Sequence, residues 1–338
     1  MRKTFLIIVL IFFLGCTHNY KTIDIDTLVL SPLKKIEQIN DSTFLSLVLN
    51  ITESNGFVYF SDSKYNRIVC VDSNYKLVHC FGSSGRGPSE FNFAGGTIVN
   101  NNKLYAIDEE NKRINIFDLT GKYIGNIKGI IPSMGRFILN DSVYFGNTMT
   151  RDAPPIFKAQ INGELIKQFG NQERILKNVN EHTPKNYFLE TCRDQMIAIC
   201  VTDPVIERYT SDGEFLNSFD YSNLAYVVQY IAYCKYKDEH DKQSGSLRGT
   251  HSFCSNSYIK GNRLYLGLAG FDNVKNKVEA NHILVLDVGG KTIKPVKMLE
   301  LRNDNGKDLW YYAFCIAGDK LIAFDCNSYE IHEFNINF

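Results

Sequence analysis

The chain has 338 residues, and its 37 Lys and Arg residues are balanced by 37 Asp and Glu residues, so the formal net charge is zero. Hydrophobic residues make up 44% of the sequence and aromatic residues 13%, which is typical of a folded protein with a large core and excludes a largely disordered chain. Binding to a nucleic-acid backbone needs a basic excess or a basic stripe. The sequence offers neither, so we expect no nucleic-acid partner.

The N-terminus has the pattern of an export signal. Arg2 and Lys3 form a short basic region, and Phe5 to Leu14 is an apolar run too short to anchor the chain as a membrane-spanning helix. Leu14-Gly15-Cys16 follows directly and resembles a bacterial lipobox. This resemblance implies cleavage before Cys16 and lipid on its sulfur and new amine, an anchor with more than one acyl chain. The alternative is an ordinary secretory signal with a coincident cysteine.

The sequence predicts a signal peptide over residues 1–15, a lipidated tether over 16–21 and a folded domain over 22–338. Thr17 stands where an aspartate would resemble an inner-membrane retention signal, which favours the outer membrane. No acidic cluster follows Cys16, and this favours the periplasmic side. We therefore expect an outer-membrane lipoprotein that faces the periplasm.

One structural unit recurs along the chain. It consists of an alternating strand, a polar hairpin rich in Asp and Asn, a second strand ending in Asp, a turn of the form Asp-x-x-Gly-Lys and a third strand. The clearest copy spans 103–124, and the copy before it spans 57–78. Val58 and Leu104 are 46 positions apart, as are Arg67 and Arg113, a spacing typical of a four-stranded propeller blade.

Four weaker copies follow, which makes six units. They begin near Ser142, Met196, Arg263 and Lys320. Short strands such as 96–99 and 136–139 precede the units and would be the innermost strand of each blade. The sequence therefore predicts an all-β fold, a six-bladed β-propeller with four-stranded blades.

The two ends of the chain indicate how the ring closes. The sixth unit stops at Phe338, before its outermost strand, while the segment from Thr22 to Leu30 alternates in polarity and belongs to no unit. We expect this N-terminal segment to supply the missing strand and remove an exposed sheet edge.

The cysteines indicate neither a zinc site nor a redox motif, because none of the eight after Cys16 forms a CxxC pair. An exported chain can form disulfides. The expected hairpin, however, pairs Cys70 with Val78 and Cys80 with Ile68, so these two cysteines lie diagonally. We predict mostly buried free thiols.

Motifs in the first two units resemble those of a known family. The motifs are Ser61-Asp62, Asn66-Arg67-Ile68, Phe81-Gly82, Gly85-Arg86-Gly87-Pro88, Asn111-Lys112-Arg113-Ile114 and Phe117-Asp118 with Gly121-Lys122. They resemble tandem NHL repeats, and with the lipobox the chain resembles the six-bladed propeller lipoproteins, NHL-like or TolB-like, of gut-type Gram-negative anaerobes. The match is strong over 57–127 and weakens afterwards, since the third to fifth blades lack the Asn-Arg-Ile motif.

The stretch GSSGRGPSEF, residues 82–91, has the glycines of a phosphate loop but joins one unit to the next. A Walker loop would need Lys-Ser or Lys-Thr after the last glycine and then a helix, whereas Pro88 and a strand follow here. The glycines would serve tight turns. The functional alternative is that Arg86, on a loop at one ring face, binds an anionic group.

Arg67 and Arg113 occupy equivalent hairpin positions beside Asn66 and Asn111. They fit a repeated Asp-Asn-Arg network that ties neighbouring hairpins together, and Arg113 is also a candidate ligand-binding residue. Trp310, in the aromatic run 310–312, is the third candidate because it could pack against the ring or stack on a sugar.

An insertion over about 223–246 is expected between the fourth and fifth blades. Tyr226, Tyr230 and Tyr233 have helical spacing, so 223–235 is predicted to be a helix that packs on the propeller. The polar group 238–241 is interpreted as a solvated loop, with metal binding as the alternative.

Two functions are consistent with these features. The first is a non-catalytic envelope module that binds a protein, peptide or glycan at one ring face, because no catalytic motif is found. The second is a metal-dependent lyase, lactonase or hydrolase, since related propellers include such enzymes. Glu53, Asp141 and Asp194 at inner-strand ends could then hold a divalent metal in the central channel. No other cofactor is indicated, and the oligomeric state is left open.

Overall fold

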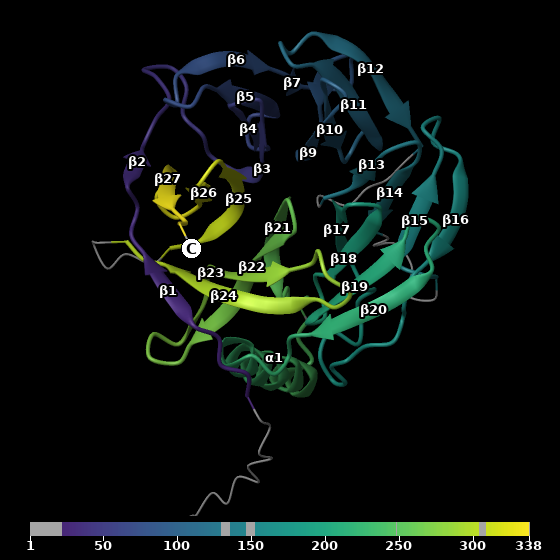
Figure 1. Cartoon of the computed structure of the whole chain (residues 1–338), viewed down its shortest axis with the longest axis vertical. Coiled ribbons are helices and arrows are strands. Elements are labelled where there is room, and N and C mark those ends of the chain that lie inside the picture. The colour runs from purple at the N-terminus through teal and green to yellow at the C-terminus, as the bar shows by residue number, and fades with distance from the viewer. Residues whose placement is uncertain (1–21, 130–135, 147–152, 248, 304–308, 338) are drawn as a thin grey trace, which may run out of the picture.

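The structure is a computed structural model that describes residues 22–129, 136–146, 153–247, 249–303 and 309–337. Cys16 and the expected signal peptide lie outside these residues. Over the described ranges, six sheets with antiparallel hairpins stand around a common centre (Figure 1). The predicted six-bladed β-propeller is therefore confirmed.

Each blade runs outward from an inner strand. The first three blades are β3 (Val48–Ser54), β4 (Phe57–Asp62), β5 (Arg67–Val71) and β6 (Leu77–Phe81); β9 (Ala94–Asn100), β10 (Lys103–Asp108), β11 (Arg113–Asp118) and β12 (Tyr123–Lys128); and β13 (Ile138–Leu139), β14 (Val143–Gly146), β15 (Ile156–Ala159) and β16 (Leu165–Phe169). The fourth and fifth are β17 (Tyr187–Cys192), β18 (Gln195–Cys200), β19 (Val205–Thr210) and β20 (Phe215–Asp220); and β21 (Cys254–Lys260), β22 (Arg263–Asp272), β23 (Lys277–Asp287) and β24 (Lys294–Leu301). The sixth contains β25 (Tyr311–Ala317), β26 (Lys320–Asp325) and β27 (Glu330–Asn335).

The core lies between neighbouring blades, because each blade packs one apolar face against the next. Between the first and second blades, for example, Tyr59 and Phe91 are buried with Phe117, and the two phenylalanine rings stack with centroids 5.9 Å apart. Alternation along each strand thus gives two apolar faces per blade, which is why many strands are buried almost throughout.

The N-terminal segment closes the ring, but by a different strand from the one expected. β2 (Lys34–Ile36) pairs antiparallel with β27 and becomes the outermost strand of the sixth blade. β1 (Thr27–Leu30), in the segment predicted to do this, instead pairs in parallel with β24 as a fifth strand of the fifth blade. The prediction that 22–30 completes the sixth blade was therefore wrong. The strand that does complete it, β2, has three residues and is too short to show an alternating pattern in the sequence.

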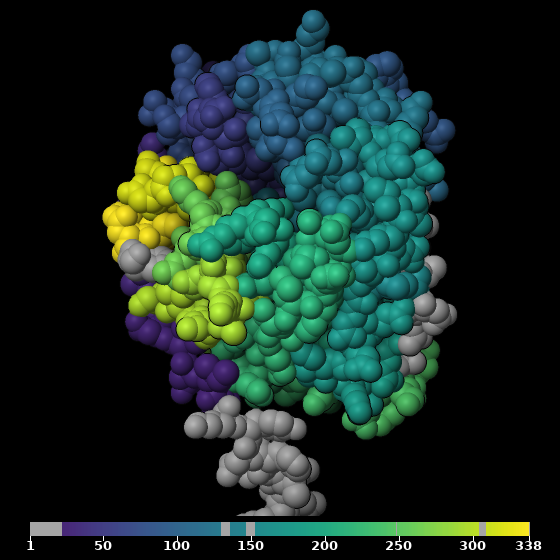
Figure 2. Space-filling view, turned by 45° about the vertical axis from the view of Figure 1, so that its right-hand side comes forward, coloured from purple at the N-terminus to yellow at the C-terminus, as the bar shows by residue number. Residues whose placement is uncertain are grey.

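The ring has two faces, defined by the turns and loops that each carries. The connection face carries the loops that join one blade to the next and the hairpins between second and third strands. The hairpin face carries the turns between first and second and between third and fourth strands. Figure 2 shows a recess near the middle of the ring, between the early blades and the green to yellow ones.

The predicted helical insertion is α1 (Ala225–Ser244), which packs on the fifth blade through its tyrosines. Tyr226 stacks on His282 with ring centroids 3.9 Å apart, and Tyr233 stacks on Phe271 at 4.3 Å. The helix continues through 238–241, so the interpretation of that group as a loop was wrong. Asp238 is buried there and lies 2.9 Å from His251 Nε2.

The eight described cysteines are free thiols, and six of them are buried, as expected. A β-bulge at Cys70 and Val71 shifts the hairpin by one residue, so Cys70 pairs with His79 and Cys80 with Val69. The predicted partners were therefore wrong, although the two cysteines are still not directly opposed. None of the helices in the described ranges has the length and apolar character needed to cross a membrane.

Candidate functional site

Buried aspartates fix the connection face. Asp62, Asp108 and Asp325 end the second strands of the first, second and sixth blades, and each is at most 1% exposed. Their carboxylates accept hydrogen bonds from the preceding connection, from the backbone N–H of Leu47 at 3.3 Å, Asn92 at 2.7 Å and Trp310 at 2.8 Å, respectively. Charge-assisted bonds of this kind hold the connections in one position.

The fourth blade uses a related contact. Asp203 lies in the hairpin after β18 and accepts from the backbone N–H of Ile175 at 2.7 Å and of Leu176 at 3.1 Å. Burial raises the pKa of Asp203, and these two hydrogen bonds oppose that rise. We call Asp62, Asp108, Asp203 and Asp325 the clamp aspartates.

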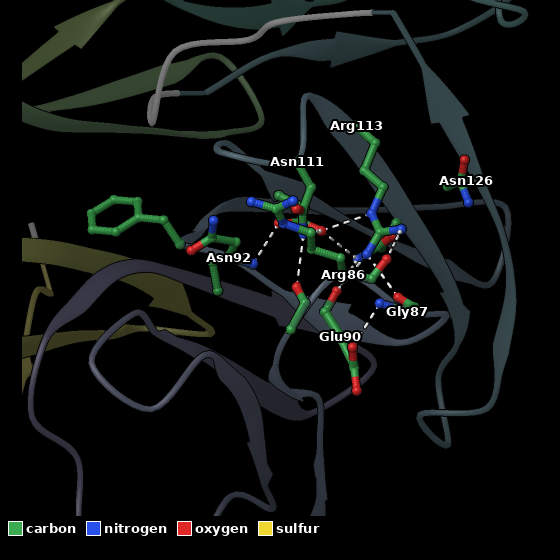
Figure 3. Close-up of polar contacts among 12 residues, drawn as sticks. Arg86, Gly87, Glu90, Asn92, Asn111, Arg113 and Asn126 are labelled. Carbon is green, nitrogen blue, oxygen red and sulfur yellow. Dashed lines mark hydrogen bonds and ion pairs between the residues drawn. The ribbon is translucent and has the colours of Figure 1, made fainter.

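Arg113 extends the second clamp onto the glycine-rich loop. Its Nε lies 2.7 Å from Asp108 Oδ2, and its Nη2 donates to the carbonyls of Gly87 and Glu90, both at 2.8 Å. Its Nη1 donates to the carbonyl of Arg86 at 3.2 Å. Figure 3 shows the guanidinium of Arg113 directed at this loop. Arg113 is 8% exposed, so its positive charge interacts with groups inside the protein and is largely shielded from solvent.

The loop is therefore a fixed blade-to-blade connection, as its sequence predicted. Asn111 Nδ2 donates to the carbonyl of Gly85 at 2.9 Å, and Glu90 Oε2 accepts from the N–H of Gly87 at 2.6 Å. β7 (Ser83–Ser84) and β8 (Glu90–Phe91) pair in parallel within it, and β9 follows.

The Arg113 side chain contacts the backbone carbonyl of Arg86. The two side chains differ in exposure. Arg86 is exposed on the connection face and Arg113 is buried beneath the loop. In the first blade, Arg67 repeats part of this network, since its Nη2 lies 3.3 Å from Asp62 and donates to the carbonyl of Phe44 at 2.6 Å. The predicted Asp-Asn-Arg network is therefore complete in the second blade, where Asn111 and Arg113 both bind Asp108. In the first blade, Asn66 instead accepts from the N–H of Phe93, and in both blades the arginine ties its hairpin to the incoming connection and not to a neighbouring hairpin. Anion binding by Arg86 stays a prediction.

Trp310 lies on the connection between the fifth and sixth blades, away from Arg86. It is half-buried, its N–H is bound by Asp325, and its carbonyl accepts from the N–H of Cys326 at 2.9 Å. Tyr312 is the second residue of the inner strand β25 and is 38% exposed, and Tyr329 in the β26–β27 hairpin is 53% exposed. Asp325 also accepts the N–H of Tyr329 through its backbone carbonyl, at 2.8 Å.

Two further aromatic rings are exposed on the connection face at the first blade. Phe44 and Tyr65 meet edge to face with ring centroids 5.5 Å apart, and the guanidinium of Arg67 lies 4.7 Å from the centre of the Tyr65 ring. We call Phe44, Tyr65, Trp310, Tyr312 and Tyr329 the aromatic surface. Only Trp310 among these was a predicted site residue; the others could be placed on one face only once the hairpins were known.

A polar cluster that the sequence did not reveal lies on the inner strands. Arg136 Nε is 3.2 Å from Glu190 Oε1 and also 3.2 Å from Asn256 Oδ1, and Ser257 Oγ donates to Glu190 at 2.9 Å. Burial raises the pKa of Glu190, and the guanidinium of Arg136 opposes the rise. These residues come from the third, fourth and fifth blades, so their spacing in sequence gave no signal.

The three carboxylates considered as metal ligands lie in separate turns of the hairpin face. Glu53 accepts the N–H of Gly56 at 3.0 Å in the β3–β4 turn, while Asp141 and Asp194 lie in the β13–β14 and β17–β18 turns. In the part of the chain that the structure describes, no three His, Cys, Asp or Glu side chains form a group that could hold a metal ion.

Comparisons with known proteins support the fold. No protein-family model and no curated protein matches the chain. A member of the DUF4221 family from Bacteroides vulgatus has a TM-score of 0.58 at 12% identity, covering 90% of this chain and 97% of that one. A Bacteroides fragilis protein classed as exported has a TM-score of 0.53 at 13% identity, covering 88% of each chain. A streptogramin B lyase has a TM-score of 0.50 at 13% identity, covering 89% of this chain and 97% of its own. At these identities the likeness shows the propeller fold alone.

The network around Arg113 predicts a specific loss of stability. Replacing Arg113 by Ala leaves the buried Asp108 carboxylate without its cation, which should lower the free energy of unfolding by about 3 kcal/mol. Differential scanning calorimetry should show a melting temperature several degrees lower. Arg86→Ala, which removes an exposed side chain from the same loop, should leave it unchanged. Equal melting temperatures for both variants would show that the Arg113 contacts contribute little.

Proposed function

We propose that the chain is a non-catalytic binding module of the bacterial cell envelope, which recognises a protein, peptide or glycan with its connection face. The observation that carries this proposal is the aromatic surface. Its four most exposed rings, those of Phe44, Tyr65, Tyr312 and Tyr329, are between 38% and 53% exposed. The connections and hairpins that carry them are held by clamp aspartates or by Arg67.

Rigid exposed aromatics suit binding for a physical reason. Each ring offers a large contact area with few rotatable bonds, so little conformational entropy is lost when a partner covers it. A fixed backbone lowers that cost further. Ring faces stack on the apolar faces of sugars and peptides, and the tyrosine hydroxyls provide hydrogen bonds at the edge. Arg86 would add a positive charge on the same face, since Asn66 Nδ2 in the Tyr65 hairpin donates to Ser84 Oγ in its loop at 3.1 Å.

The alternative is a lyase, lactonase or hydrolase with its site in the central channel. The observation in its favour is the cluster of Arg136, Glu190 and Asn256 on the inner strands, because a buried carboxyl with a raised pKa is a candidate general acid or base. A metal-dependent mechanism would need further oxygen ligands close to this cluster. Glu53, Asp141 and Asp194 do not gather into such a group.

Site-specific photo-crosslinking tests the binding proposal. A benzoylphenylalanine at position 312 or 329 of the full-length protein in its native cells should give a discrete adduct, and the adduct should disappear when Phe44 and Tyr65 are both changed to Ser. Phe215 is the matched control, since it is 55% exposed but lies at the start of β20 on the hairpin face. Adducts of the same kind from position 215, or none from 312 and 329, would contradict the proposal.

We also infer that the protein is anchored in the outer membrane through lipid on Cys16, facing the periplasm. The support is the Leu14-Gly15-Cys16 sequence after a short apolar run. An alkynyl fatty acid fed to expressing cells should label the protein, and Cys16→Ser should abolish labelling and release the chain from the membrane fraction. Labelling that survives this substitution would place the lipid elsewhere. An unlabelled wild-type protein would indicate an ordinary secretory signal.

A further inference from the structure

An open pocket lies on the hairpin face, opposite the aromatic surface, between the fourth and fifth blades. Its volume is about 510 Å³, and it is lined by the turn 192–195, by Arg208 and Asn217, and by the turn 288–291. The two blades lie side by side, teal-green and yellow-green in Figure 2. Three cations, Arg193, Arg208 and Lys291, line this pocket against one acid, Asp194. Its net positive character predicts an anionic ligand.

Arg208 is a buried cation that forms no ion pair among the described residues, although the Asp287 carboxylate acts on it at longer range. It is 1% exposed, and its Nη1 and Nη2 donate to the carbonyls of Gly290 at 2.5 Å and Val288 at 2.8 Å. Its Nε is buried and has no hydrogen-bond partner among the described residues. The third blade offers a comparison, because Lys158 reaches across to the fourth blade in the same way and lies 3.4 Å from Asp212. Arg208 forms no such ion pair in the described chain.

Asn217 presents the complementary group beside Arg208. The two residues are paired across β19 and β20, so their side chains lie on the same face of the sheet. Asn217 Nδ2 donates to the carbonyl of Lys291 at 2.9 Å, while its Oδ1 is buried and has no partner within the described part of the chain. Arg208 Nε and Asn217 Oδ1 thus lie on neighbouring strands beneath the pocket surface, each without a hydrogen-bond partner among the described residues. Buried polar groups of this kind are normally satisfied.

Arg193 stands where the other blades have residues suited to a tight turn. The turns between first and second strands begin with a left-handed residue at Asn55, Asn101, Gly261 and Gly318, with φ between 48° and 63°. Asn and Gly adopt this conformation readily. Arg193 has the same conformation, with φ at 58°. The turn itself does not call for an arginine there, so the residue contributes its charge to the pocket.

The facing turn of the fifth blade is enlarged at the same place. Residues 287–294 separate the paired Leu286 and Pro295, and within them Asp287 pairs with Lys294, which leaves a six-residue turn, 288–293. The matching turns of the first four blades are the five-residue stretches 72–76, 118–122, 160–164 and 210–214. The enlarged turn carries Gly289, Gly290 and Lys291 to the pocket. A Cβ at Gly289 would approach the Asn262 side chain to 2.4 Å, so glycine is required there.

We propose that this pocket binds a small hydroxylated oxyanion, a sugar carboxylate or a sugar phosphate. The exposed side chains of Arg193 and Lys291 bind the anionic oxygens, and the buried charge of Arg208 beneath them strengthens the attraction. The exposed Asp194 carboxylate accepts from a ligand hydroxyl. Arg with Lys around one oxyanion is a common recognition pattern. The site is on the opposite face from the aromatic surface and does not depend on it.

Titration calorimetry on the full-length protein in detergent, at low salt, tests the proposal. Glucuronate and glucose 6-phosphate are the two anionic probes, and glucose is the neutral one. We expect at least one anion to bind with a Kd in the millimolar range or below, and glucose to bind at least tenfold more weakly. Binding of only one anion identifies the ligand as a carboxylate or a phosphate. If neither anion binds, the proposal is wrong.

Arg193→Asn is the decisive variant, because asparagine already occupies this turn position at Asn55 and Asn101 and the fold should be kept. It should weaken anion binding at least tenfold with an unchanged melting temperature, and Lys291→Ala should do the same. Lys103→Asn is the matched control, since Lys103 is the exposed cation beside the equivalent turn of the second blade. If the Arg193→Asn and Lys103→Asn variants bound the anion with equal affinity, the assignment of the site would be overturned. It would also be overturned if inorganic phosphate bound as tightly as both sugar anions.

Discussion

The hydrogen bonds from inter-blade connections to buried clamp aspartates are the interaction on which this propeller's connection face depends. A connection that crosses from one blade to the next has backbone N–H groups that no strand pairs. Asp62, Asp108 and Asp325 accept one such N–H each, and a hydrogen bond to a charged group contributes about 1.5–3 kcal/mol. The contacts therefore turn loops into fixed supports. The side chains that these loops display, from Arg86 to Trp310, are held in place as a result.

The clamp also explains why the repeat weakens along the chain. In the first and second blades, Arg67 and Arg113 form ion pairs with the clamp aspartate. In the sixth blade, the Ser328 hydroxyl donates a hydrogen bond to Asp325. The third blade has Gly146 at the end of its second strand. The fifth has Asp272, which accepts from the N–H groups of Val274 and Lys275 within its own hairpin.

The fourth blade combines its clamp with a different buried network. Tyr187 and Tyr209 both donate to Glu207 Oε2 at 2.8 Å, and Lys185 lies 3.5 Å from Glu207 Oε1. The blades that depart from the repeat are thus stabilised by contacts of their own, and the pocket around Arg208 is built where two of them meet.

The sequence was sufficient for the features that repeat. The Asp-Asn-Arg hairpins and the spacing of 46 residues predicted the blades, and the spacing of Tyr226, Tyr230 and Tyr233 predicted a helix packed on the ring. Features that occur once were not predictable. β2 is too short for any period. Arg136, Glu190 and Asn256 come from three blades, and the unpaired Arg208 Nε depends on how the fourth blade meets the turn of the fifth.

Native-state hydrogen exchange at the N–H groups of Leu47, Asn92 and Trp310 would measure how firmly the clamp aspartates hold the connections. These amides lie outside the named strands, and each donates to a clamp aspartate. We expect them to exchange as slowly as amides within the neighbouring strands, because opening requires the buried carboxylates to lose their partners. Exchange close to the rate of an unprotected loop would contradict this expectation, and would mean that the connection face is not held as described.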